Sequence, residues 1–263
     1  MSDRDRLLAS PDRALSCTNT KALLDHQNFD AFATALRGEA DELASVGFIV
    51  LVPAQLLDMA AAAFDGTGIG WGAQNVWRDA SPPTGEIAAE ALAHAGCRHV
   101  MTGHPERRAR LAEDDTTVAA SAASAAEAGI VPIVCVGEPA RSTTEDAVHT
   151  VTGQAAPVLG SLPVGAPVVW LYEPPWTSEI HQAAPPSQVA VVCETLRNLS
   201  SERTDDVRVL YGGAVVPGVL PALLDAGCQL DGLGVGKAAY DTGQRQAVTA
   251  ELAAAAREAR HQG

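Results

Sequence analysis

The segment Thr117–Glu138, TVAASAASAAEAGIVPIVCVGE, contains the pattern that decides the fold. Its first twelve residues, 117–128, are rich in alanine and have the composition of a helix. The apolar run Val131–Val136 is typical of a strand that is buried on both faces, and a polar loop starts at Gly137. The segment therefore predicts a helix, a buried strand and a polar loop in series.

The same alternation repeats along the chain. Further apolar runs occur at Ala14–Cys17, Phe48–Val52, Ile69–Gly72, His99–Met101, Val168–Leu171, Val207–Leu210 and Leu230–Val235. Further helical segments are expected at Phe29–Ala44, Glu86–Ala95, Ser187–Leu199, Pro217–Asp225 and Gln244–Arg260. Eight such units indicate parallel strands joined by helical crossovers. Because no Pro- or Ser-rich linker divides them, we expect an α/β protein with one closed (β/α)8 barrel over residues 14–263, after a short N-terminal extension, residues 1–13.

Length and charge agree with this interpretation. The chain has 263 residues, close to the ~250 of a single α/β barrel. The 18 Lys and Arg against 32 Asp and Glu give a formal net charge of 18 − 32 = −14, which argues against a nucleic-acid partner. A single anionic metabolite remains possible, since backbone N–H groups at helix starts can bind an anion locally.

The N-terminal segment and the cysteines indicate in which cellular compartment the protein is expected. No apolar run of signal-peptide type occurs in the first 16 residues, and the longest apolar run, Phe48–Val52, is far too short to span a membrane. The five cysteines are widely spaced and form no CxxC pair. We therefore expect a cytoplasmic protein without membrane attachment, disulfide framework or metal site.

Residues capable of chemistry follow the predicted strands. Asn19-Thr20-Lys21 follows the first, Gly103-His104-Pro105-Glu106 the fourth and Tyr172-Glu173-Pro174-Pro175-Trp176 the sixth. Further motifs in chain order are Gly72-Ala73-Gln74-Asn75, Thr84-Gly85-Glu86, Gly137-Glu138 and Tyr211-Gly212-Gly213-Ala214. In a barrel the loops after the strands share one face, so these side chains are expected to converge.

In this order, the motifs resemble those of the triosephosphate isomerase family over nearly the whole chain, from about Leu15 to the last helix. The resemblance implies a TIM barrel and an enzyme of glycolysis and gluconeogenesis. It implies that Glu173 is the base that moves a proton between adjacent carbons and that His104 is a neutral imidazole that polarises the carbonyl. By the same resemblance, Lys21 anchors the enediolate and the phosphate, Asn19 is an orienting donor beside Lys21, and Glu106 is a carboxylate near that lysine.

The chemistry of these residue types fits the implied reaction. An aldose–ketose isomerisation needs one base and donors aimed at two oxygens, which a carboxylate, an imidazole and an ammonium provide without a metal or cofactor. The Pro-Pro pair after Glu173 restricts the backbone and suits the hinge of a lid. We therefore expect no cofactor and a small phosphorylated sugar as substrate.

Three departures from the family pattern concern the predicted phosphate site, formed by Gly213, Ala214, Gly236, Lys237 and Glu179. Glu179 stands where the family lid has a glycine, and Ala214 replaces a serine. Lys237 replaces the second of two glycines, a substitution similar to that in a branch of the family that acts on four-carbon tetrulose phosphates. A positive charge there can offset Glu179 or reach a longer substrate.

The family resemblance also implies a homodimer, in which Thr84, Gly85 and Glu86 reach toward the partner subunit. The loop before them is one residue shorter than is common in the family, and Thr20 occupies the place of an aromatic residue.

Four functions remain open from the sequence. The first is isomerisation of dihydroxyacetone phosphate and glyceraldehyde 3-phosphate, and the second is the same chemistry on an erythrulose phosphate. The third is a non-catalytic sugar-phosphate-binding barrel, suggested by the altered phosphate loops. The fourth, a Schiff-base aldolase, would need Lys21 or Lys237 to be desolvated and deprotonated.

Overall fold

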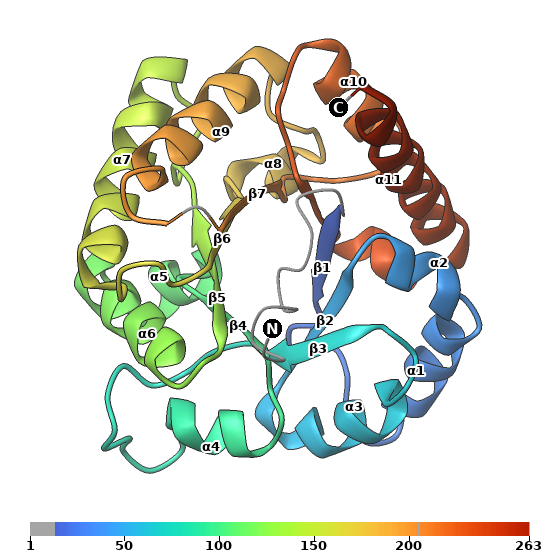
Figure 1. The fold of residues 1–263 in the computed structure, drawn as a ribbon, viewed down its shortest axis with the longest axis vertical. Helices are drawn as coiled ribbons and strands as arrows, with labels where there is room; N and C mark the ends of the chain where they lie inside the picture. Colours follow the sequence, from blue (N-terminus) through green and yellow to red (C-terminus); the bar gives the residue numbers. More distant parts are fainter. Residues whose placement is uncertain (1–13, 205, 263) are drawn as a thin grey trace.

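The computed structural model describes residues 14–204 and 206–262, and the expected N-terminal extension lies outside this range. Eight parallel strands form a closed barrel in sequential order, and β1 pairs with both β2 and β8 (Figure 1). The strands are β1 (Leu15–Asn19), β2 (Phe48–Val52), β3 (Gly70–Ala73), β4 (His99–Thr102), β5 (Val131–Val136), β6 (Val168–Tyr172), β7 (Val207–Tyr211) and β8 (Gly232–Gly234). The predicted barrel is therefore confirmed.

Helices surround the barrel on the outside (Figure 1). They are α1 (Phe29–Arg37), α2 (Ala40–Ser45), α3 (Leu57–Phe64), α4 (Ala89–His94), α5 (Pro105–Leu111), α6 (Asp115–Glu127), α7 (Thr144–Ser161), α8 (Trp176–Ile180), α9 (Pro186–Ser200), α10 (Val219–Asp225) and α11 (Thr242–Gln262). Two short 3-10 helices, η2 (Ala54–Leu56) and η3 (Lys237–Tyr240), follow β2 and β8.

The core has two layers, because alternate residues of each strand point in opposite directions. Side chains such as Cys17, Ile49 and Leu171 fill the inside of the barrel. The larger layer lies between strands and helices. Strands buried on both faces lose the polar alternation of half-exposed strands, which explains the continuous apolar runs in the sequence.

Two segments differ from the sequence-based expectation. The helix expected at Phe29–Ala44 is broken at Gly38 and Glu39 into α1 and α2. The backbone of Glu39 is non-helical, and its carboxylate accepts hydrogen bonds from Arg245 of α11 at 2.7 and 2.8 Å. The loop expected after β6 contains the short helix α8.

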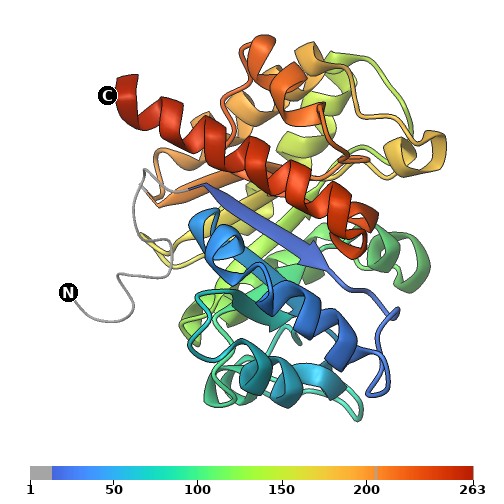
Figure 2. The ribbon, with the colours of Figure 1, turned by 90° about the vertical axis from the view of Figure 1, so that its right-hand side faces the viewer.

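All strands point to one end of the barrel. Figure 2 shows β1 pointing toward the end at which the segment after β6 protrudes. The loops after the strands gather at this end, as the sequence predicted, and they carry the candidate site.

Candidate active site

His104 lies in a tight turn between β4 and α5. Gly103 has a φ of +68°, and a Cβ at this position would lie 2.9 Å from the Val118 side chain and 3.2 Å from the Cys135 carbonyl oxygen, so the turn needs glycine. The Nδ1 atom of His104 accepts a hydrogen bond from the Glu106 backbone N–H at 3.2 Å. Because Nδ1 is an acceptor, the proton of the neutral ring lies on Nε2. That nitrogen is buried and has no hydrogen-bond partner among the described residues.

Glu173 follows β6, and its carboxylate faces the imidazole. The Oε1 atom of Glu173 lies 3.9 Å from Nε2 of His104, and the Glu173 side chain is 22% exposed. On the other side, the Cys135 thiol lies 3.7 Å from Oε2 and points toward it. Burial, together with the nearby Glu173 carboxylate, raises the pKa of the Cys135 thiol well above its ordinary value, so the thiol keeps its proton and donates a hydrogen bond to Glu173.

Leu171 forms an apolar floor below this carboxylate, two residues earlier on the same face of β6. A Cβ added to Gly234 would lie 2.7 Å from Cδ1 of Leu171, and one added to Gly212 would lie 2.9 Å from the same atom. The Cβ at Gly212 would also lie 3.5 Å from Cβ of Glu173. The two glycines therefore make room for Leu171 beneath Glu173.

Lys21 lies in the turn after β1 with a φ of +50°, which is unusual for a residue with a side chain. Its backbone N–H donates to Oδ1 of Asn19 at 2.8 Å, and Nδ2 of Asn19 donates to the Met101 sulfur at 3.1 Å. The ammonium of Lys21 forms an ion pair with Glu106 at 2.8 Å. Burial alone would raise the pKa of Glu106, but the hydrogen bond and charge of Lys21 outweigh it and the pKa is lowered.

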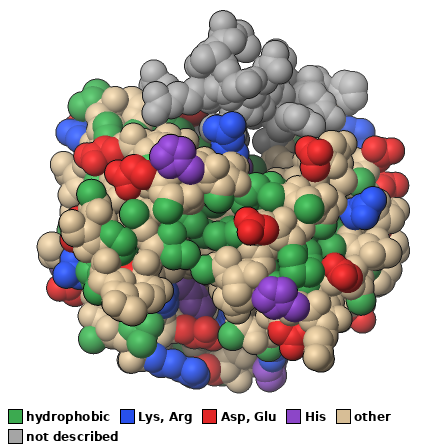
Figure 3. Space-filling view, turned by 90° about the horizontal axis from the view of Figure 1, so that it is seen from below, with side chains coloured by type: hydrophobic (Ala, Val, Ile, Leu, Met, Phe, Trp, Pro, Cys, Tyr) green, Lys and Arg blue, Asp and Glu red, His purple; other side chains and the backbone are tan. Residues whose placement is uncertain are grey.

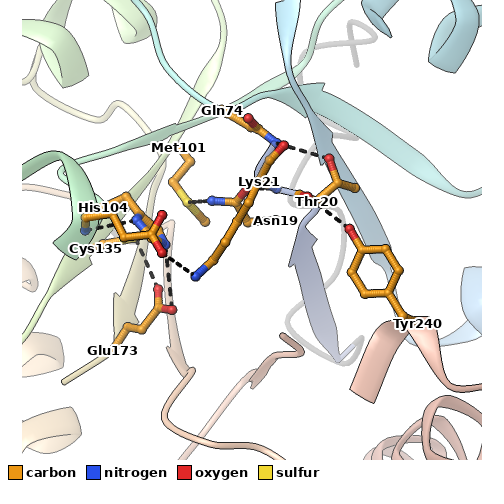
Figure 4. Close-up of polar contacts among 10 residues, drawn as sticks. Asn19, Thr20, Lys21, Gln74, Met101, His104, Cys135, Glu173 and Tyr240 are labelled. Atoms are coloured by element: carbon orange, nitrogen blue, oxygen red, sulfur yellow. Dashed lines mark hydrogen bonds and ion pairs between the residues drawn. The ribbon is translucent and has the colours of Figure 1, made fainter. Parts of the chain in front are cut away.

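These groups converge on one hollow. Figure 4 shows the Lys21 side chain extending from β1 toward His104 and Glu173, while the Cys135 side chain lies behind them. Asn19, Lys21, His104 and Glu106 line a pocket of about 300 Å³. The scattered sequence motifs thus meet at one end of the barrel: His104 and Lys21 line the pocket, and the Glu173 carboxylate lies 3.9 Å from Nε2 of His104.

The segment predicted to form a lid, residues 174–184 and called the lid segment below, is attached to a buried carboxylate at its start. Glu138 is 2% exposed and accepts hydrogen bonds from Trp176 at 2.9 Å, from Gln188 at 2.8 Å and from the Tyr172 hydroxyl at 3.1 Å. At the other end of the lid segment, the Ala184 N–H donates to the Tyr211 hydroxyl at 2.7 Å. The lid is therefore held at both ends.

The predicted phosphate-site residues lie on the neighbouring loops after β6, β7 and β8. Gly213 is buried and lies beside the lid segment, since a Cβ added there would be 2.9 Å from Oγ1 of Thr177. Ala214 has a φ of +47°. Glu179 is exposed on α8. Gly236 and Lys237 are exposed where η3 starts. Neither Lys237 nor Lys21, whose side chain is 41% exposed, is desolvated as a Schiff-base lysine would require.

The predicted dimer residues lie beside the same pocket. Gly85 and Glu86 contribute to its lining, Thr84 is exposed, and Glu86 accepts a hydrogen bond from Asn75 at 3.3 Å. Figure 3 views the molecule from the side on which α4 lies in Figure 1, and hydrophobic side chains gather there around a hollow. Arg107 and Arg108, expected in ion pairs or subunit contacts, pair with Glu113 at 2.6 Å and Asp115 at 2.5 Å.

Within residues 14–204 and 206–262, no three His, Cys, Asp or Glu side chains form a group that could hold a metal ion. No helix in this part of the chain has both the length and the apolar composition that crossing a membrane requires.

One polar contact at the site had no signal in the sequence. The hydroxyl of Tyr240 donates to the carbonyl oxygen of Thr20 at 3.0 Å, across 220 positions of the chain (Figure 4). Residues so far apart in the sequence meet only when the barrel closes. Tyr240 and Thr20 share no sequence motif that could have predicted their contact.

Comparisons with known proteins agree with the geometry. A family model described as triosephosphate isomerase matches residues 15–253. A protein named triosephosphate isomerase from Bordetella pertussis is 41% identical over 203 residues, which cover 76% of this chain and 82% of the relative. A protein named L-erythrulose-1-phosphate isomerase from Pectobacterium atrosepticum is 34% identical over 186 residues, 68% of this chain and 71% of that relative. The crystal structure of triosephosphate isomerase from Bartonella henselae matches with a TM-score of 0.74 and 29% identity, over 91% of this chain and 98% of that one.

Proposed function

Because the chain belongs to the triosephosphate isomerase family and is thus an aldose–ketose isomerase, we propose that it interconverts dihydroxyacetone phosphate and glyceraldehyde 3-phosphate. The observation that carries this proposal is the arrangement of Glu173, His104 and Lys21 at the ends of their strands, with His104 and Lys21 lining one pocket. The Glu173 carboxylate lies 3.9 Å from an unpartnered imidazole nitrogen of His104, and the Lys21 ammonium extends toward both.

In the proposed mechanism, Glu173 removes a proton from C1 of dihydroxyacetone phosphate. The electron pair of that C–H bond forms a C1–C2 double bond, and the carbonyl electrons move to the oxygen on C2. His104 donates a hydrogen bond from Nε2 to this oxygen, and the ammonium of Lys21 stabilises the negative charge. The protonated Glu173 then returns a proton to C2. The proton of the O1 hydroxyl moves, by way of Nε2 of His104, to the oxygen on C2, which leaves the aldehyde at C1 and a hydroxyl at C2.

The surroundings of Glu173 support its role as a base. The Leu171 floor and the buried Cys135 thiol limit access of water from below, while the lid segment lies above the strand end. Lid closure over this site would exclude water and protect the enediolate from losing its phosphate. The isomerisation oxidises one substrate carbon and reduces its neighbour, so it consumes no redox cofactor.

For the phosphate, the proposed contacts are the backbone N–H groups near Gly213, Ala214 and Gly236, together with Lys21 and Lys237. A second candidate substrate is an erythrulose phosphate. The Pectobacterium relative carries that name, and Lys237 is an exposed cation at the start of η3 that can accompany a longer substrate.

We also propose a homodimer through the face shown in Figure 3. Its support is that Gly85 and Glu86 line the pocket that contains Lys21 and His104, so a partner bound at these residues would close the pocket from that side.

The test compares kcat/KM for D-glyceraldehyde 3-phosphate and for L-erythrulose 1-phosphate, in the wild type and in Glu173→Gln. We expect the triose phosphate to be preferred and Glu173→Gln to lower its kcat/KM by about 10² to 10⁴, the range for loss of a general base. Glu194→Gln removes the same charge from an exposed position on α9 and serves as the matched control.

A higher kcat/KM for the erythrulose phosphate than for the triose phosphate would show that the erythrulose phosphate is the preferred substrate. Wild-type activity in Glu173→Gln would overturn the assignment of the base. Absence of turnover on both substrates would favour a binding protein.

A further inference from the structure

The turn that carries Lys21 is held in a strained conformation by side chains from distant parts of the chain. Lys21 has a φ of +50°, and its carbonyl oxygen accepts a hydrogen bond from Nε2 of Gln74 at 2.9 Å. The preceding carbonyl, that of Thr20, accepts from the Leu23 N–H at 3.2 Å within the turn and from the Tyr240 hydroxyl at 3.0 Å. Left-handed backbone of this kind persists only where surrounding contacts stabilise it.

Tyr240 is placed for this contact by both its backbone and its ring. It ends η3, and the carbonyl oxygen of the preceding residue, Ala239, accepts a hydrogen bond from Arg245 at 2.7 Å. Arg245 is 2% exposed and also binds both carboxylate oxygens of Glu39. The Tyr240 ring packs on Phe32 of α1 with ring centres 5.2 Å apart. The position of the hydroxyl is therefore fixed by two contacts, the hydrogen bond of Arg245 to the preceding backbone carbonyl and the packing of the ring on Phe32.

The hydroxyl is a permanent donor at neutral pH. Burial raises the pKa of Tyr240 to about 12, so the proton stays on the oxygen. The Thr20 carbonyl can only accept, which fixes the direction of the hydrogen bond.

We propose that Tyr240 is a positioning residue for the Lys21 ammonium: its hydrogen bond to the Thr20 carbonyl holds the turn that directs Lys21 into the site. This inference rests on the proposed function, in which Lys21 attracts the anionic substrate. The same 3-10 helix begins at Lys237, in the predicted phosphate site, so Tyr240 also connects that site with the Lys21 turn through a single helical segment.

The experiment measures the Kd of 2-phosphoglycolate, a carboxylate analogue of a three-carbon enediolate phosphate, by calorimetry. It uses the wild type, Tyr240→Phe, Lys21→Ala and the double variant. Tyr240→Phe keeps the ring on Phe32 and removes only the hydroxyl. We expect it to weaken binding about three- to tenfold, as the loss of one neutral hydrogen bond does. In the Lys21→Ala background the same substitution should change Kd less than twofold, because its effect passes through Lys21.

Phe32→Leu is the packing control, because it disturbs the same ring contact and leaves the hydroxyl in place. Equal weakening by Tyr240→Phe in both backgrounds, equal weakening by Phe32→Leu, or no weakening at all would overturn the inference. Absence of binding to the wild type would overturn the proposed function and this inference with it. Binding that depends on Lys21 but not on Tyr240 would leave the proposed function intact and refute only the inference.

Discussion

Gly234 should not tolerate even one added methyl group, because Leu171 occupies the space beside it. The Cβ of alanine at position 234 would lie 2.7 Å from Cδ1 of Leu171 and 3.3 Å from the Gly212 Cα. Carbon atoms pack best at about 3.5–4.0 Å, so the contact with Leu171 is about 1 Å too short and the backbone on the other side blocks a shift. Overpacking of this kind costs about 1–3 kcal/mol, which corresponds to a fall in Tm of roughly 2–12 °C for a chain of this size.

Activity should fall as well, since Leu171 lies directly below Glu173. A displacement of the base by a fraction of an ångström lowers the rate, and we expect Gly234→Ala to reduce kcat by about ten- to hundredfold. Urea unfolding at one fixed protein concentration measures the free energy of unfolding, and a steady-state assay measures kcat.

Two further variants identify the cause. Leu171→Val in the Gly234→Ala background removes the colliding Cδ1, so the double variant should be more stable than the sum of the single effects by at least about 1 kcal/mol. Gly153→Ala is the matched control, because Gly153 is exposed in α7 with no atom within 4 Å of an added Cβ, and alanine there should stabilise by about 0.5–1 kcal/mol. The packing argument would be refuted if the effects of Gly234→Ala and Leu171→Val on the free energy of unfolding were strictly additive. It would also be refuted if the Gly234→Ala protein were as stable as the wild type.

Two other predictions concern buried polar groups. Glu138→Leu leaves the Tyr172 hydroxyl and the Trp176 indole N–H, both buried, without an acceptor, while Gln188 keeps its bond to the Tyr172 hydroxyl. This variant should cost at least about 2 kcal/mol, whereas Glu138→Gln keeps an acceptor oxygen and should cost less; equal free energies of unfolding in the two variants would contradict this. Burial raises the pKa of Cys17 to about 12 and that of Cys97 to about 11, from 9.0. The folded state therefore retains protons that the unfolded state loses, so the free energy of unfolding should fall from about pH 9 to pH 11. Urea midpoints at pH 8 and pH 10 measure this loss, which should be smaller in Cys17→Ala; unchanged midpoints would contradict it.

The barrel could be predicted because its strands are buried on both faces. Val131–Val136 and Phe48–Val52 match the observed strands β5 and β2, since an uninterrupted apolar run has clear ends. The end of α1 could not be predicted in the same way. Glu39 leaves the helix to bind Arg245, a residue 206 positions away, and no local pattern announces such a partner.

The candidate site was predicted in outline for a related reason. Lys21, His104 and Glu173 each follow a strand, and barrel closure brings strand ends together whatever their separation in sequence. The structure brings these three residues together, while their roles stay predictions. The Leu171 floor and the Tyr240 contact were not predicted, because they depend on side-chain packing across the barrel rather than on any motif.

The most direct test of the central claim is the fate of the transferred proton in deuterated water. Dihydroxyacetone phosphate is incubated with the enzyme in D₂O, and the glyceraldehyde 3-phosphate formed is examined by NMR. A proton carried by Glu173 exchanges with solvent, so we predict deuterium at C2 of the product with the wild type, and a loss of product and deuterium of at least about 10²-fold with Glu173→Gln. Product that contains no deuterium, or deuterium incorporation at the wild-type rate in Glu173→Gln, would contradict the account.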